Sequence, residues 1–231
     1  MLTGQSIVVG YGGDAIVRGV DVGVPEGTLV ALLGPNGAGK STLIKALAGE
    51  LQLTSGTIKL GDREVTSLPG DRRVLLGMGY VPQLGRVFTR LSIRENLEMG
   101  AYAVKGSLTE RFDRVYTLFP DLKHHFKRPA SQLSGGQQAM LGIGRALMGD
   151  ASILLLDEPT AGMSPAYVEQ LWDSLVQIRQ MRIAVMVVEQ NVSAALEHCD
   201  TAYVLVDGRV VSHDNCSALI GREDVEGLFV G

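Results

Sequence analysis

Short apolar runs separated by turn residues fill the first third of the chain. Residues 6–9, 16–24 and 28–33 are rich in valine, isoleucine and leucine, and turns containing glycine or proline lie between them. β-Branched residues bounded by such turns are typical of strands. After Leu33 the period changes, because Leu43, Leu47 and Leu51 recur at four-residue spacing. This spacing predicts a helix over residues 40–51.

The rest of the chain shows one helical stretch, followed by helices and strands in regular alternation. Between residues 91 and 129, apolar positions such as Leu97, Val115 and Leu118 follow helical spacing, which predicts a helical insertion. A short strand is expected before it, at residues 79–81. Beyond it, helices are predicted at 137–148, 167–180 and 192–198, and apolar strands at 152–156, 183–188 and 202–206. The predicted fold class is therefore α/β, with a mostly parallel sheet that helices cover on both faces.

Composition and charge narrow the functional classes. The chain has 231 residues, of which 45% are apolar, enough for one large buried core. Its 21 basic and 25 acidic residues give a net charge of −4, which does not favour nucleic acid as a partner. The longest apolar runs are far shorter than the ~20 residues of a membrane-spanning helix. Two cysteines, Cys199 and Cys216, show neither a disulfide framework nor metal-ligand spacing, and with the absence of a signal sequence they predict a cytoplasmic location.

The clearest chemical motif lies between a predicted strand and a predicted helix. It comprises Gly34, Pro35, Asn36, Gly37, Ala38, Gly39, Lys40, Ser41 and Thr42. In a phosphate loop of this spacing, main-chain N–H groups and a helix N-terminus converge on the β-phosphate. Lys40 would reach the β- and γ-phosphates and Ser41 would ligate Mg²⁺. An ordinary glycine-rich turn is the other interpretation.

Two adjacent carboxylates end a predicted buried strand. Residues 153–156 are aliphatic and are followed by Asp157 and Glu158. A strand buried on both faces explains the aliphatic run but not the two acids. Asp157 is placed to hold Mg²⁺ directly or through water, and Glu158 can accept a proton from the water that attacks the γ-phosphate. A solvated strand end is the alternative.

A third motif directly precedes a predicted helix. It consists of Leu133, Ser134, Gly135, Gly136 and Gln137. Ser134 suits a helix N-cap, which is a sufficient structural explanation. The two glycines also let the helix N–H groups approach an anion closely, as a second phosphate-binding helix terminus would.

Together these motifs resemble the ATP-binding cassette family over essentially the whole chain. Residues 34–42 resemble its Walker A motif, 153–157 its Walker B motif, Glu158 its catalytic glutamate and 133–137 its signature. The resemblance implies a single ABC ATPase domain over residues 1–231. Within it, a core with an antiparallel β-subdomain would take 1–83 and 152–231, and a helical subdomain with the signature 84–151. It also implies a head-to-tail dimer that sandwiches two ATP molecules, each signature closing on the γ-phosphate held by the partner's Walker A.

Two further residues are similar to family positions. Tyr11 resembles the aromatic residue that stacks on adenine, although a tyrosine at a strand end needs no such role. Gln83 resembles the glutamine of the Q-loop, which contacts Mg²⁺ or the attacking water and leads into the helical subdomain. Without the family, Gln83 would be a loop residue.

Two positions depart from the family pattern. Gln190 stands where the switch histidine is usual. Its amide can donate to a γ-phosphate oxygen but cannot become cationic, so hydrolysis is expected to be slower or to depend on a partner. Ser164 stands where the D-loop usually has aspartate, which puts communication across the dimer in doubt.

The departures point to one branch of the family. Segments 85–88, 95–97, 140–147 and 189–191, and an end near Phe229, resemble the second ATPase of branched-chain amino-acid importers, related to those for urea and short amides. The resemblance implies an Mg²⁺-dependent ATPase at the cytoplasmic face of the membrane. Its partners would be a second cassette, either a related ATPase or a copy of itself, two membrane permease subunits and indirectly a solute-binding protein.

Two alternative functions stay open from the sequence. An ATPase of a lipid exporter would share every catalytic residue, and a regulator that binds ATP without hydrolysing it would fit Gln190.

The role of the apolar residues after Gln83 is also open. They would either receive a permease helix or pack within the helical subdomain, and they are Val87, Phe88, Leu91 and Ile93.

Overall fold

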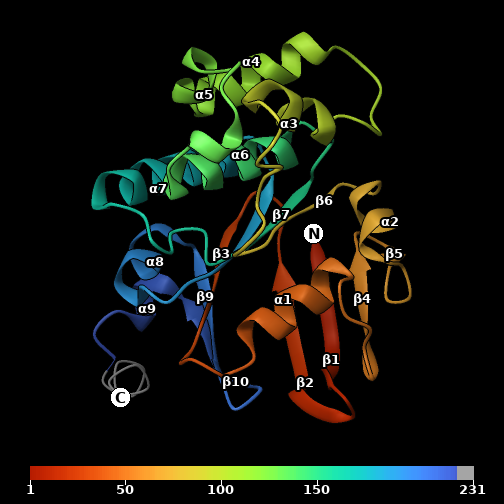
Figure 1. Ribbon diagram of the computed structural model, residues 1–231. Coiled ribbons are helices and arrows are strands. Elements are labelled where there is room, and N and C mark those ends of the chain that lie inside the picture. Colours follow the sequence, from red (N-terminus) through yellow and green to blue (C-terminus); the bar gives the residue numbers. More distant parts are fainter. Residues whose placement is uncertain (223–231) are drawn as a thin grey trace.

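Two β-sheets and a set of helices make up the described part of the chain. The computed structural model describes residues 1–222, and residues 223–231, which include the segment near Phe229, lie outside the described residues. Figure 1 shows the helices of residues 93–147 at the top of the view, with the two sheets below them. Among residues 1–222, no helix is both long enough and apolar enough to cross a bilayer.

The larger sheet positions the residues with candidate chemistry. Its strands lie in the order β10 (Arg209–Asn215), β9 (Thr201–Val206), β3 (Leu29–Leu33), β8 (Ala184–Val188), β7 (Ile153–Asp157) and β6 (Met78–Val81). The strands from β9 to β6 pair in parallel, whereas β10 pairs antiparallel with β9. Every residue of β3, β7 and β8 is buried, as expected where both faces are covered. Leu32 and Asp157 both pair with Val188, so the carboxyl ends of these three strands are level.

One face of the larger sheet is covered by a helix together with the smaller sheet. The smaller sheet is antiparallel, in the order β2 (Asp14–Val24), β1 (Leu2–Tyr11), β4 (Ser55–Leu60) and β5 (Arg63–Glu64). Val30 and Met186 of the larger sheet share a buried cluster with Leu43 of α1 (Lys40–Ala48) and Ile7 of β1. The alternation of strands and helices predicted helices over both faces, and the family resemblance implied an antiparallel β-subdomain. On this face α1 is joined by the valine- and isoleucine-rich N-terminal strands, which bury their alternate residues against the larger sheet.

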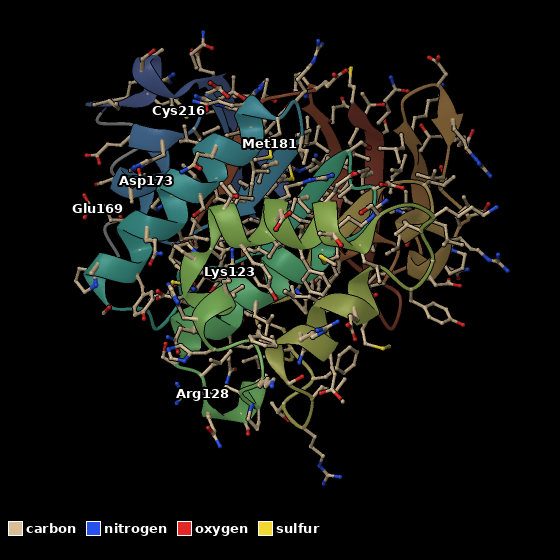
Figure 2. The ribbon with its side chains drawn as sticks, turned by 90° about the horizontal axis from the view of Figure 1, so that it is seen from above. Lys123, Arg128, Glu169, Asp173, Met181 and Cys216 are labelled. Atoms are coloured by element: carbon tan, nitrogen blue, oxygen red, sulfur yellow. The ribbon has the colours of Figure 1, made fainter. Side chains whose placement is uncertain are left out.

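The opposite face is covered by helices, as predicted. These are α6 (Gly135–Leu147), α7 (Pro165–Gln180), α8 (Val192–His198) and α9 (Cys216–Leu219). Trp172 of α7 is buried, and its ring stacks on that of His198 of α8 with centroids 5.0 Å apart. Glu169 and Asp173 are exposed on the outer side of α7 (Figure 2).

The helical insertion expected from the sequence is present. It contains α3 (Ile93–Gly100), α4 (Leu108–Leu118), α5 (Pro120–His124) and a 3-10 turn (Ala130–Gln132), and it leads into α6; we call α3 to α6 the helical region. Serine side chains at Ser92, Ser107 and Ser134 cap α3, α4 and α6 by accepting a main-chain N–H three residues later. Leu97 and Val115 are fully buried between these helices.

The observed elements differ from the predicted ones mainly at their ends. The helix predicted over residues 40–51 ends at Ala48, because Gly49 adopts a left-handed conformation with φ of 85°. The sequence analysis missed β4, β5, β10, α9 and α2 (Gly70–Val74). β10 is largely polar and exposed at a sheet edge, so it lacks the apolar pattern that identified the buried strands.

A buried arginine fixes the C-terminal end of α1. The Arg73 guanidinium, on α2, donates to the carbonyl oxygens of Ala46 and Leu47 at 2.9 and 2.6 Å, and to those of Thr66 and Leu68 at 3.0 and 2.9 Å. Burial lowers its pKa to about 10. A cation at a helix C-terminus is favourable because unpaired carbonyls and the helix dipole both place negative charge there.

We predict that Arg73→Leu lowers the free energy of unfolding by about 3 kcal/mol, because four hydrogen bonds to carbonyl oxygens are lost, two of them buried. Urea unfolding measures the change. Arg72→Leu is the matched control, since the Arg72 side chain is 65% exposed, and it should change stability by less than about 0.5 kcal/mol. Equal losses in the two variants would contradict this role of Arg73.

Candidate functional site

The phosphate loop connects β3 to α1 at the carboxyl edge of the larger sheet. Gly34 has φ of 151°, and a Cβ atom there would lie 2.1 Å from the carbonyl oxygen of Leu205, so only glycine fits. Gly39, the residue before α1, is left-handed with φ of 103° and leaves the helix without a side-chain cap. The first turn of α1 also contains no acidic residue. Its free N–H groups are therefore available to an anion.

Lys40 lies buried over its own loop. Its ammonium donates to the carbonyl oxygens of Gly34 at 2.7 Å and Pro35 at 3.0 Å. Burial lowers the pKa of Lys40, and the carboxylates of Glu158 and Asp157 oppose that shift. These carbonyl contacts fix the ammonium at the loop that the sequence predicted it would serve.

Asp157 and Ser41 meet although 116 residues separate them. The Ser41 hydroxyl donates to Asp157 Oδ1 at 3.1 Å. The two residues meet because α1 begins, and β7 ends, at the same edge of the sheet. Burial raises the pKa of Asp157, whereas the hydrogen bond from Ser41 lowers it. Within residues 1–222, no cluster of three or more His, Cys, Asp or Glu side chains could hold a metal ion. A metal at this pair would therefore need further oxygen ligands, such as amide, phosphate and water oxygens, which Mg²⁺ readily uses.

The Glu158 carboxylate accepts hydrogen bonds from two glutamine side chains that lie far apart in the sequence. Gln83 Nε2 donates to Glu158 Oε2 at 2.6 Å, and Gln190 Nε2 donates to the same oxygen at 2.8 Å. Gln83 follows β6 and Gln190 follows β8, so the parallel sheet brings all three together. The amide of Gln190 donates at every pH and stays uncharged. A histidine at this position would instead change its charge with pH.

The signature residues form an exposed helix start. Ser134 accepts from Gln137 N at 3.3 Å, and Gln137 Oε1 accepts from Ser134 N at 3.1 Å. Ser134 and Gly135 are exposed, and nothing lies within 4 Å of a Cβ atom built on Gly135. Leu133 and Gly136 are buried beneath them. The N-terminus of α6 thus faces open space, where an external ligand can approach it.

Tyr11 lies at a hairpin of the smaller sheet. It ends β1, pairs with Asp14 across a hairpin and is half exposed. A surface hollow of about 650 Å³ beside the phosphate loop is lined by Gly37, Ile16 and neighbouring residues, but not by Tyr11. Stacking of Tyr11 on adenine therefore stays a prediction.

The apolar residues after Gln83 separate into two groups. Val87 and Ile93 are buried in the core, as the packing alternative predicted, and Leu91 is partly buried. Phe88 is about half exposed and lines a hollow of about 270 Å³ between β6 and the helical region. The Arg145 guanidinium lies 4.8 Å from the Phe88 ring centroid in the same hollow.

Two buried charged residues beside Glu158 were not singled out by the sequence analysis. Arg86 and Glu189 are 8% and 2% exposed, and both hydrogen-bond to residues 158–160. Each lies within a segment that was noted only for its family resemblance. The available signal was a charged residue near a predicted site residue after a buried strand: Glu189 is adjacent to Gln190, and Arg86 lies three positions after Gln83.

Comparison with known proteins agrees with these motifs. The family model described as ABC transporter matches residues 17–161. The chain is 40% identical over 232 residues to the high-affinity branched-chain amino acid transport ATP-binding protein BraG of Pseudomonas aeruginosa, with all of both chains covered. It is 32% identical to the lipopolysaccharide export system ATP-binding protein LptB of Escherichia coli K12, covering all of this chain and 97% of the relative.

A solved structure shares the fold. The crystal structure of a nucleotide-free ATP-binding cassette from an ABC transporter has a TM-score of 0.88 to this chain at 24% identity, with 100% of this chain and 99% of that chain covered. The predicted α/β fold, with its parallel sheet, antiparallel β-sheet and helical insertion, is confirmed.

We predict that Lys40→Ala weakens MgATP binding by at least about 100-fold, because no other cation in the loop replaces its contact with the phosphates. Isothermal titration calorimetry measures the affinity. Lys45→Ala, in the last turn of α1, is the control and should keep wild-type affinity. Unchanged binding by Lys40→Ala would contradict the assignment of the loop.

Proposed function

The chain belongs to the ABC transporter family and hydrolyses ATP, and we propose that it energises uptake of branched-chain amino acids through separate membrane permease subunits. The observation that carries the proposal is the convergence of the phosphate loop, the Asp157–Ser41 pair and Glu158 at one edge of the sheet, in a chain 40% identical to BraG over its full length. Within that function, the roles proposed for Lys40, Ser41, Asp157 and Glu158 are supported by their contacts.

The triphosphate would be held by main-chain groups of the phosphate loop. The uncapped first turn of α1 supplies N–H donors and the positive end of the helix dipole. Lys40, already at the loop, would exchange its carbonyl contacts for phosphate oxygens. We assign the adenine ring to Tyr11 on the family resemblance alone.

Mg²⁺ would be held by Ser41 and Asp157, with Gln83 beside them. A hydroxyl, a carboxylate and an amide carbonyl are the oxygen ligands that Mg²⁺ prefers, and the first two already lie 3.1 Å apart. Gln83 donates to Glu158 through Nε2, which leaves its carbonyl oxygen for the metal or its water. When bound, the ion neutralises charge on the phosphate oxygens.

Glu158 would act as the general base. Its carboxylate takes a proton from the water that attacks the γ-phosphorus, the bond from that phosphorus to the ADP oxygen breaks, and ADP and phosphate leave. The two amides on Oε2 orient the carboxylate without adding charge. Gln190 thus supports the base directly, which makes the site compatible with hydrolysis in the absence of a histidine.

A second cassette would complete the site. The exposed N-terminus of α6 has no phosphate of its own chain to bind, and Gly135 leaves it open to a partner's nucleotide. Ser164, the D-loop departure, is exposed and makes no side-chain cap on α7, so it can reach a partner chain. We propose a head-to-tail pair with a related ATPase or a second copy.

Permease subunits would dock at the hollow beside Phe88. The hollow combines apolar side chains, such as Phe88 and Met99, with the cation of Arg145. An amphipathic helix from a membrane subunit fits that chemistry. The chain would then lie peripherally at the cytoplasmic face of the membrane, with a solute-binding protein acting only through the permeases.

We predict that Ser134→Arg retains MgATP affinity but lowers ATP turnover by at least about 100-fold, because an added cation and its bulk block the approach of α6 to the partner's nucleotide. Calorimetry and phosphate release measure the two quantities. Ser107→Arg is the matched control, since Ser107 also caps an exposed helix start but lies outside the signature. Normal turnover by Ser134→Arg would exclude a shared site.

We also predict that deleting this gene in its source organism abolishes most uptake of radiolabelled leucine, isoleucine and valine. Wild-type protein should restore uptake and Glu158→Gln should not, because the transport step needs hydrolysis. If uptake is unchanged and the outer surface loses lipid instead, the exporter alternative is correct.

A further inference from the structure

A strained turn carries the candidate base Glu158. Glu158 has φ of 47°, a left-handed conformation that costs a non-glycine residue of this type about 1 kcal/mol or more. Its N–H donates to Val188 O at 3.0 Å, and its carbonyl accepts from Ala161 N at 3.2 Å. Such a conformation persists only where the surroundings fix it, and the surroundings of residues 158–160 include two buried charged side chains.

Arg86 holds the carbonyl groups of this turn. Its Nη2 donates to Glu158 O at 2.8 Å, and its Nη1 donates to Pro159 O at 3.2 Å. Its Nε donates to Pro82 O at 3.2 Å, next to Gln83. One rigid guanidinium thus connects the backbone beside both Glu158 and the glutamine that donates to it.

Glu189 holds the donor groups of the same turn. Its Oε1 accepts from Thr160 N at 3.2 Å, and its Oε2 accepts from the Thr160 hydroxyl at 2.9 Å. Glu189 Oε2 also accepts from the main-chain N–H of Gln190 at 3.3 Å, next to the second amide on Glu158. Its carboxylate therefore ties the turn to the end of β8.

The negative charge of Glu189 favours the charged form of Arg86. Burial lowers the pKa of Arg86 and raises that of Glu189, and the largest opposing influence on Arg86 is the carboxylate of Glu189. Within the described residues, the side-chain hydrogen bonds of Arg86 all go to main-chain carbonyl oxygens. The guanidinium therefore fixes backbone positions and does not pair directly with the Glu158 carboxylate.

We propose that Arg86 and Glu189 are positioning residues, which hold the Glu158–Thr160 turn in its strained conformation and so aim the Glu158 carboxylate at the attacking water. The inference rests on the proposed role of Glu158 as base. It adds a connection to the helical region, because Arg86 packs against α6. A Cβ atom at Gly142 would lie 3.2 Å from Arg86 Cβ and from its carbonyl oxygen.

The principal test is Arg86→Met in the full-length chain, assayed by MgATP calorimetry and by phosphate release. We expect kcat to fall about 100-fold and the dissociation constant and KM for MgATP to change less than about 3-fold, because displacing a reacting group by about 1 Å has an effect of this size. Arg86→Lys keeps the charge but lacks the fork that reaches two carbonyls, so it should recover part of the lost rate. Glu189→Gln should lower kcat about 10-fold.

A double-variant cycle separates positioning from general stability. With Glu158→Gln already present, adding Arg86→Met should change the residual single-turnover rate less than about 3-fold, because the group that Arg86 aims has lost its function. Arg111→Met is the matched control, since Arg111 is also buried and donates to the carbonyls of Lys105 and Met148, outside the site. It should lose thermal stability but keep kcat.

Several results would overturn the proposal. These are wild-type kcat in Arg86→Met, a loss of affinity as large as the loss of rate, or a full further loss in the Glu158→Gln background. Should Arg86→Met not fold, Arg86→Lys and Glu189→Gln decide the question by the same kcat and affinity measurements. If Glu158→Gln itself turns over normally, the base assignment fails independently, whereas a failed uptake experiment leaves these ATPase measurements unaffected.

Discussion

The level register of three parallel strands is the constraint on which the site depends. β3, β8 and β7 pair so that Leu32, Val188 and Asp157 lie side by side, and each strand then continues into a polar segment. The phosphate loop, the Glu189–Gln190 pair and the Asp157–Glu158 pair consequently meet at one edge, as ligand sites in open α/β sheets do. Their sequence separation is irrelevant once the register is set.

Burial disfavours the charged forms of the ionisable residues at that edge. Lys40, Asp157, Arg86 and Glu189 are each less than a tenth exposed, and desolvation shifts the pKa of every one of them against its charged form. Each is stabilised by hydrogen bonds to the main chain or to a hydroxyl. These bonds also fix where the groups lie, so one set of contacts stabilises the charges and orders the site.

The sequence predicted those site residues that belong to a recognisable motif directly after an apolar strand. Lys40, Ser41, Asp157 and Glu158 follow apolar strands, and the rule that parallel strands end at a common edge places them together. The contact between Arg86 and residue 158 was not predictable in this way, because it joins residues 72 apart that share no motif. The sequence also did not predict that Val87 is buried whereas Phe88 is exposed. Both lie in a loop without a regular period, so their positions do not indicate which side chain faces the core. β10 was missed because an exposed edge strand tolerates polar residues.

The stacking of Trp172 on His198 gives the chain a natural optical probe. Trp172 is the sole tryptophan of the sequence, and it lies on the helix that follows the turn of Glu158, against the helix that follows Gln190. Indole emission depends on the groups packed against the ring. The fluorescence of the unlabelled protein therefore reports on the packing between the two helices that follow these strand ends.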